Sequence, residues 1–128
     1  MAERWTRYLK GDEIEPYSAG ITPHRLDLLA VKVMAEAGVD ISHQRSKPID
    51  EVKNIGFDYV ITVCSEAEEN CPLFPGGVKL CHIYFDDPPE LVSSLKDEEE
   101  ALFHYRRVRD EIRKFVEKLP EILAELCL

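Results

Sequence analysis

Residues 58–64, "DYVITVC", are apolar at nearly every position, and this run decides the fold. Side chains of a strand point alternately to its two faces, so apolar residues at successive positions need two buried faces. Strands buried on both faces are typical of parallel sheets that helices cover. Residues 58–64 therefore predict a buried strand of a parallel sheet.

Two more strands are predicted, one on each side of this run along the chain. Residues 78–85, "VKLCHIYF", form a second apolar run. Residues 13–20, "EIEPYSAG", predict a strand that ends in a glycine turn. Pro16 pushes that strand towards a sheet edge or a strand end, because proline has no N–H to donate to a neighbour.

Helices are predicted before and between these strands. Residues 1–10 predict the end of a helix that Gly11 stops. Residues 22–38 predict a longer helix, with Thr22 as its N-cap and Pro23 at its first position. Its apolar face is formed by Leu26, Leu29, Val33 and Ala37, and Gly38 closes it. A short helix is expected to begin at Pro48.

The last helix is predicted from about Glu98, where apolar residues recur at helical spacing. These residues are Leu102, Tyr105, Val108, Ile112, Phe115 and Leu119. Pro120 is expected to kink or end the helix. Alternating strands and helices predict an α/β fold in three layers, a small, mostly parallel sheet flanked by helices. We expect residues 1–128 to form a single domain.

Composition excludes several classes of protein. The 128 residues are 45% hydrophobic and 32% charged, with a net charge of -9. This acidic balance argues against nucleic-acid binding, which depends on Lys and Arg contacts to phosphates. It also repels small anions at long range, so an anionic substrate would need a locally positive pocket. No apolar run approaches the ~20 residues of a membrane span, and the charged first ten residues do not resemble a signal peptide. We expect a cytoplasmic protein in a reducing compartment.

Cys64 and Cys71 stand seven positions apart, directly after the first predicted strand. On one helix this spacing separates the Cα atoms by ~10 Å, whereas a disulfide needs them within ~7 Å. A bond between them would therefore require the segment to unwind or loop out, and would act as a conformational switch. Ser65 is expected to cap a short acidic helix here. Its N-terminus favours the Cys64 thiolate and the nearby glutamates oppose it, so the direction of the pKa shift stays open.

The cysteine spacing does not match a zinc site. The four cysteines include C-x6-C and then C-x9-C, with His82 directly after Cys81, and none of this is a CxxC pattern. Cys81 lies inside a predicted strand and is expected to be a buried thiol that behaves as a small hydrophobe. Cys127, near the C-terminus, carries no functional signal.

Five segments of the chain form a further pattern. They are "YSAGI" at 17–21, "GVDISHQRSK" at 38–47, "ITVCSEAEENCP" at 61–72, "FDDP" at 85–88 and "RRVRDEI" at 106–112. In order and spacing they resemble thioredoxin-coupled arsenate reductases of the low-molecular-weight tyrosine phosphatase superfamily. The resemblance covers nearly the whole chain. It implies arsenate as substrate, thioredoxin as external reductant, no bound cofactor and a monomer.

The resemblance also implies a role for three residues. In that family a first cysteine, in a C-x5-R phosphate loop, attacks arsenate, and a second attacks the adduct and releases arsenite. A third attacks the second, and thioredoxin reduces the resulting disulfide. By position, Cys64 resembles the second cysteine and Cys71 the third. Asp87 resembles the general acid that protonates the leaving oxygen. Without the resemblance, residues 85–88 would indicate only a polar turn after a strand.

The first cysteine of this relay is absent from the sequence, because no cysteine has an arginine six positions later. In the family, "MAE" directly follows the phosphate loop, and here it occupies residues 1–3. We therefore expect a chain truncated at its N-terminus, without its first strand and loop, poorly packed beside residues 58–64 and inactive by itself. A misplaced start, including a selenocysteine codon read as a stop, and a true truncation both stay open.

Two other functions stay open as well. A low-molecular-weight protein tyrosine phosphatase needs no resolving thiols, so the Cys64 and Cys71 pair argues against it. Pro89 also stands where such phosphatases tend to carry aromatic residues. A non-catalytic remnant would fit the missing loop. Some family members bind potassium with an acidic side chain where this chain has Lys47, whose own charge predicts that no metal binds there.

Four arginines of the last predicted helix could suggest an anion site. They are Arg106, Arg107, Arg109 and Arg113. Acidic residues surround them on an amphipathic helix, so we expect a solvated face instead.

Overall fold

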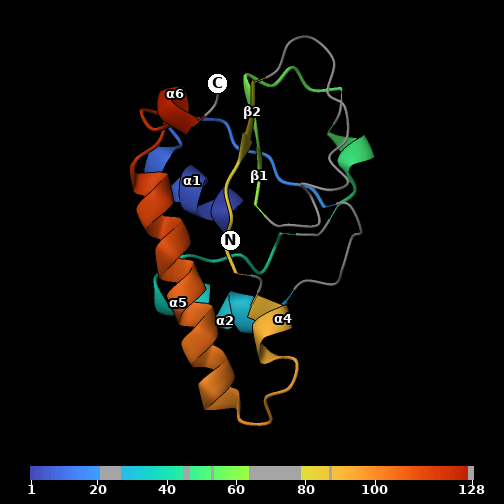
Figure 1. The fold of residues 1–128 in the computed structure, drawn as a ribbon, viewed down its shortest axis with the longest axis vertical. Coiled ribbons are helices and arrows are strands. Elements are labelled where there is room, and N and C mark those ends of the chain that lie inside the picture. The colour runs from blue at the N-terminus through green and yellow to red at the C-terminus, as the bar shows by residue number, and fades with distance from the viewer. Residues whose placement is uncertain (21–26, 45–46, 53, 64–78, 87, 127–128) are drawn as a thin grey trace.

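A computed structural model gives the fold and describes residues 1–20, 27–44, 47–52, 54–63, 79–86 and 88–126. The elements in chain order are α1 (Ala2–Lys10), α2 (Leu28–Glu36), the 3-10 turn η1 (Ile49–Glu51), β1 (Tyr59–Thr62), β2 (Lys79–His82), α4 (Pro88–Val92), α5 (Glu98–Glu117) and α6 (Leu123–Leu126). Figure 1 shows α5 running along one side of the molecule, with α1 and α2 packed against it and the strand pair beyond α1. Among the described helices, none is both long and apolar enough to cross a membrane.

The two strands confirm the predicted parallel sheet. β1 pairs with β2 in parallel, with Tyr59 opposite Lys79 and Ile61 opposite Cys81. The strand predicted at residues 58–64 was expected to be buried on both faces. That prediction is wrong for the described residues, because all four residues of β1 are only half-buried. Val63, just beyond β1, is 40% exposed. The reason is that, among the described residues, β2 is the only strand that pairs with β1.

The core forms between α5 and the first two helices. The predicted stripe on α5 is confirmed at Leu102, Tyr105, Val108 and Ile112, and Leu119 just beyond the helix is buried as well. Phe115, also predicted, is only half-buried, and Ala101 and Val116 are buried in addition. Trp5 of α1 and Val33 and Met34 of α2 pack into the same core with no exposed area. Because full burial of a large apolar side chain contributes about 1.5–3 kcal/mol, this contact dominates the stability of the described part. The helix ends at Glu117, as the position of Pro120 predicted.

The start of α2 differs from the prediction. Asp27 has an extended backbone, with φ -78° and ψ 111°, and is the N-cap, so the helix begins at Leu28. Thr22, the predicted cap, lies outside the described residues. The Asp27 carboxylate accepts hydrogen bonds from the backbone N–H groups of Leu29, at 3.1 Å, and Ala30, at 3.5 Å. Its second oxygen accepts a hydrogen bond of 2.6 Å from the Tyr105 hydroxyl of α5, which ties the cap to the core.

The end of α2 confirms the predicted glycine stop. Gly38 has φ +83°, a left-handed conformation that only glycine adopts without strain. The N–H of Gly38 donates to the Ala35 carbonyl at 3.0 Å, and the N–H of Val39 donates to the Met34 carbonyl at 2.9 Å. These two bonds form a Schellman motif, which satisfies the last carbonyls of the helix.

Residues 13–20 do not form the predicted strand. Gly20 makes one isolated parallel bridge with Pro48, supported by a 2.9 Å hydrogen bond from the Gly20 N–H to the Lys47 carbonyl. The predicted short helix after Pro48 is present as the 3-10 turn η1.

Candidate functional site

The carboxyl edge of the sheet brings the two most specific segments together. Beyond the strands, the Ile83 N–H donates to the Thr62 carbonyl at 2.8 Å, and the Phe85 N–H donates to the Val63 carbonyl at 3.3 Å. Cys64 follows Val63 directly, so the chain that enters "CSEAEENCP" leaves the sheet beside the chain that enters "FDDP". This edge is where α/β proteins place their sites. Cys64, Cys71 and Asp87 themselves lie outside the described residues, and their roles stay predictions.

An ion pair ties the segment after β2 to α5. The Arg107 guanidinium donates to the Asp86 carboxylate at 2.9 Å, and a second nitrogen bonds Glu111 at 3.0 Å. The hydrogen bond from Arg107, followed by one from Tyr84, lowers the pKa of Asp86 below its ordinary value. The ring of Phe85 contacts that of Phe115 edge-on, with centroids 5.8 Å apart. The residue before Asp87 is therefore anchored by charge and by packing.

The other arginines of α5 are also engaged with acidic side chains. Arg106 binds both carboxylate oxygens of Glu36, at 2.8 and 2.9 Å. Arg113 bonds Glu117 at 3.0 Å, and its guanidinium lies 5.2 Å from the centre of the Trp5 ring. Arg106, Arg107 and Arg113 keep 37%, 36% and 47% of their side-chain surface exposed, which agrees with the predicted solvated face. Arg109 differs from the other three arginines, because its side chain is mostly buried rather than solvated.

Arg109 is 13% exposed, and it donates to the Val33 carbonyl of α2 at 2.8 Å. It also lies 3.5 Å from Glu36, so it joins α5 to the end of α2. A long side chain such as Arg109 can bury its aliphatic stem while its charged end forms hydrogen bonds. Arg109 therefore contributes both packing and charge pairing between the two helices.

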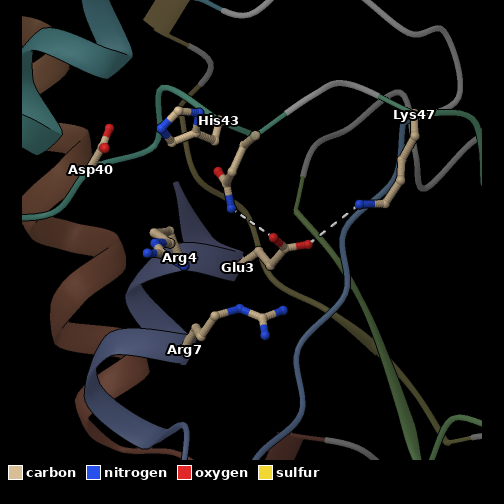
Figure 2. A pocket seen from close by; sticks show the side chains of 7 residues that line it. Glu3, Arg4, Arg7, Asp40, His43 and Lys47 are labelled. Carbon is tan, nitrogen blue, oxygen red and sulfur yellow. Dashed lines mark hydrogen bonds and ion pairs between the residues drawn. The ribbon is translucent and has the colours of Figure 1, made fainter.

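A second polar centre lies at the first turn of α1, and we call it the Glu3 cluster: Glu3, Ser18, Gln44 and Lys47. The Glu3 carboxylate accepts hydrogen bonds from the Ser18 hydroxyl at 2.9 Å and the Gln44 amide at 2.7 Å. The Lys47 ammonium lies 3.7 Å from the same carboxylate, and these two side chains are only 20% and 11% exposed (Lys47 first). Figure 2 shows Lys47 reaching Glu3 from a neighbouring segment. Lys47 thus places its positive charge next to the Glu3 carboxylate.

Sequence reasoning missed Glu3 because no spacing rule links residues 3, 18, 44 and 47. The cluster borders a hollow of about 350 Å³. Its lining side chains are Glu3, Arg4, Arg7, Asp40, His43, Gln44 and Lys47. Among the described residues, no group of three His, Cys, Asp or Glu side chains lies close enough to hold a metal ion.

Cys81 is buried as predicted, with 1% of its surface exposed. It is disulfide-bonded, however, so the prediction of a free thiol is wrong in this structure. The partner cysteine lies outside the described residues. The position of Cys81 within an apolar strand indicated its burial but carried no information about its pairing.

Known proteins resemble the chain over nearly its whole length. The arsenate reductase of Bacillus licheniformis is 45% identical over 121 residues, which cover 94% of this chain and 85% of the relative. The arsenate reductase of Bacillus subtilis strain 168 is 43% identical with the same coverage.

Solved structures agree with these relatives. An arsenate reductase in its oxidized state superimposes with a TM-score of 0.70 at 27% identity, covering 92% of this chain and 83% of that one. The crystal structure of the Archaeoglobus fulgidus arsenate reductase gives a TM-score of 0.68 at 28% identity, covering 92% of this chain and 86% of that one. The model of the low-molecular-weight phosphotyrosine protein phosphatase family matches residues 1–126. This chain therefore belongs to the low-molecular-weight phosphotyrosine protein phosphatase family, within which its similar relatives are arsenate reductases.

Proposed function

We propose that this chain carries the resolving part of an arsenate reductase that thioredoxin regenerates. The observation that carries the proposal is the 3.3 Å hydrogen bond between the Phe85 N–H and the Val63 carbonyl. It joins the chain that leads into Cys64 to the chain that leads into Asp87. Relatives at 45% and 43% identity that bear the name arsenate reductase support the same reaction.

Each proposed role follows from the chemistry of thiols. A nucleophilic cysteine outside this sequence forms a sulfur–arsenic bond with arsenate, while Asp87 protonates the oxygen that leaves as water. The Cys64 thiolate attacks that cysteine sulfur, and the sulfur–arsenic electron pair departs with arsenic, which leaves as arsenite. The Cys71 thiolate then attacks Cys64, forms the Cys64–Cys71 disulfide and frees the first thiolate. Thioredoxin, the external dithiol, reduces that disulfide.

Further parts of the proposal concern the state of the protein. Residues 1–128 act as one domain, in a monomer, in the cytoplasm, where a thioredoxin pool keeps Cys64 and Cys71 reduced. The chain as given does not turn over arsenate, because the sequence holds no C-x5-R segment for the first attack. No bound cofactor is required, since the electrons come from the thiols.

The test is a coupled assay with arsenate, thioredoxin, thioredoxin reductase and NADPH. We expect no NADPH oxidation with the 128-residue chain, and turnover when a C-x5-R segment of the family is fused before Met1. In that fusion, Cys64→Ser and Cys71→Ser should each lower turnover by more than 100-fold, because a hydroxyl cannot form a disulfide. Ser94→Ala, at an exposed position, serves as the control and should retain turnover.

Three results would overturn this function. Turnover by the 128-residue chain would show that the missing nucleophile is not needed. Hydrolysis of p-nitrophenyl phosphate by the fusion, without arsenate reduction, would favour a phosphatase. A fusion that neither reduces arsenate nor hydrolyses the ester, while folding normally, would favour the non-catalytic remnant.

A further inference from the structure

We propose that Cys81 forms its disulfide with Cys127, and that this bond is a redox-sensitive clasp which holds α6 against the sheet. Cys81 is disulfide-bonded and only 1% exposed, inside β2. The sequence has three other cysteines, so the partner within the chain is Cys64, Cys71 or Cys127. The positions of the described elements point to one of them.

The register of the sheet argues against Cys64. Cys81 lies opposite Ile61 in the parallel pair, so both side chains are on the same face of the sheet. The ladder continues to Val63, whose carbonyl accepts the Phe85 N–H at 3.3 Å. A residue that follows Val63 in the same strand comes three positions after Ile61, on the opposite face and about 10 Å further along. A disulfide requires Cα atoms within about 7 Å, so this register separates Cys64 from Cys81.

The packing of α6 favours Cys127. The helix lies against β2, the strand that carries Cys81 (Figure 1). Leu123, at the start of α6, is 6% exposed and belongs to the same apolar core as Cys81. Cys127 directly follows Leu126, the last residue of α6. Of Cys71 and Cys127, it is therefore Cys127 that comes directly after a described element in contact with β2.

A cross-link at this place affects α6 more than the longer helices. α6 has four residues, about one turn, and a helix of that length is not stable by itself. In the described part of the chain, Leu123 packs into the core and Ile122 lies half-buried beside it. A Cys81–Cys127 bond adds a covalent attachment, and it closes a loop over residues 81–127 that restricts the unfolded chain. Reduction removes both effects, so α6 separates from β2 more readily when Cys81 and Cys127 are thiols.

The clasp opens by thiol–disulfide exchange with an external dithiol. A thiolate of the dithiol attacks one sulfur of the bond and forms a mixed disulfide, and the second thiol of the reductant then displaces the protein sulfur. The two protons of the dithiol pass to Cys81 and Cys127, and the dithiol becomes a disulfide. Closing transfers two electrons from the two thiols to an oxidant of the disulfide class, such as glutathione disulfide. Because Cys81 is 1% exposed, exchange has to wait until α6 moves off β2.

The clasp is separate from the proposed reaction and does not depend on it. It uses neither Cys64 nor Cys71, so both stay available for the disulfide that the relay forms. In a compartment that keeps thiols reduced, the few disulfides that form are mostly catalytic or redox-sensing. A buried bond that exchanges slowly fits the second class, because it closes only when an oxidant accumulates.

Tryptic mapping tests the pairing in the 128-residue chain, after equilibration with glutathione disulfide and alkylation of free thiols. Trypsin cuts after lysine and arginine, so Cys81 lies in peptide 80–96, Cys127 in peptide 119–128, and Cys64 and Cys71 together in peptide 54–79. We expect peptide 80–96 joined to peptide 119–128 in the monomer band of a non-reducing gel. Peptide 80–96 joined to peptide 54–79, a Cys81 that stays free, or a link found only in a dimer band would overturn the proposal.

Thermal unfolding tests what the clasp contributes, in a Cys64→Ser/Cys71→Ser chain in which no other cysteine pair can form. Adding Cys127→Ser should lower the melting temperature of the oxidised chain by about 5–15 °C, as expected for the loss of one disulfide. A reductant should lower that of the parent chain by a similar amount and leave the Cys127→Ser chain unchanged. Ser94→Ala, at an exposed position, is the control and should retain the parent value. A parent melting temperature that does not respond to the reductant would overturn the clasp.

Exchange kinetics test whether α6 covers the bond. In the same parent chain, reduction by dithiothreitol, trapped by alkylation, gives the rate at which the clasp opens. Leu123→Ala removes the buried contact of α6 and should speed reduction roughly tenfold, because moving α6 off β2 then costs less. Leu28→Ala, at a residue that is 78% exposed, is the control and should change the rate by less than about twofold. Circular dichroism checks that both variants fold, and equal rates in the two would contradict a clasp covered by α6.

Discussion

The helices and the strand pair of this molecule differ in how completely they are buried. Trp5, Met34 and Leu102, from three different helices, have no exposed area. All four residues of β1 are half-buried, and Val63 at its end is 40% exposed. The stability of the described part thus comes mainly from contacts between helices. The segments that carry the proposed reactive residues follow the less buried strands β1 and β2. Four substitutions measure how much each of the two regions contributes to the free energy of unfolding.

The largest loss of stability is expected from Leu102→Ala. Leu102 is 0% exposed, near the start of the α5 stripe, so its truncation leaves a cavity that costs about 2–5 kcal/mol. Urea unfolding followed by circular dichroism gives the value. Phe103→Ala, at a neighbouring residue that is 63% exposed, is the control and should cost less than about 0.5 kcal/mol. Equal losses at the two positions would contradict a core on one face of α5.

The second-largest loss of stability is expected from Tyr105→Phe. It removes the hydroxyl that donates to the Asp27 carboxylate at 2.6 Å, and a hydrogen bond to a charged group contributes about 1.5–3 kcal/mol. The same unfolding measurement applies. Tyr8→Phe removes a hydroxyl from a side chain that is 62% exposed and should leave stability nearly unchanged. If the two changes were equivalent, the link between α5 and the α2 cap would contribute nothing.

Ile61→Ala tests the strand pair directly. Ile61 is half-buried on β1 and packs against the core, so we expect a loss of about 1–2 kcal/mol, below that of a fully buried residue. The comparison with Leu102→Ala on one denaturation scale is the measurement. A loss as large as that of Leu102→Ala would show that the strands stabilise the molecule as strongly as the helices do.

The smallest effect is expected from Asp86→Asn, and it depends on pH. The hydrogen bond from Arg107 lowers the pKa of Asp86, so the pair stabilises the fold above the ordinary value of 3.8. That contribution is lost as the pH falls below 3.8 through the lower folded value. The difference between wild type and Asp86→Asn should therefore be present at pH 7 and vanish in acid. In an Arg107→Gln background the difference should become clearly smaller, leaving the part that comes from the Tyr84 hydrogen bond; an undiminished difference would exclude this ion pair as its main source.

Sequence predicted the elements whose evidence is local and repeated. The α5 stripe recurs over 20 residues of helix, which leaves little ambiguity about its buried face. The apolar runs predicted strands β1 and β2. The alternation of strands with helices predicted that these strands pair in parallel. The resemblance to arsenate reductases pointed to the family that the comparisons then showed.

Other features depend on contacts between distant residues. Thr22 and Asp27 are both good N-caps by type, and the Tyr105 hydroxyl, 78 positions from Asp27, favours the second. The burial of β1 depends on which strands lie beside it. Cys64, Cys71 and Asp87 remain predictions, because the structure describes their anchors, Val63 and Asp86, but not the residues themselves.

The Glu3 cluster has a consequence for the way the molecule opens. One carboxylate on α1 holds side chains from positions 18, 44 and 47, so the first turn of the helix cannot separate from those segments without leaving a charge unpaired. Segments that share such a bond open together as one cooperative unit. In hydrogen exchange, the amides of this turn and of residues 42–44 would therefore share one opening free energy, and the Glu3→Gln substitution would lower it for all of them at once.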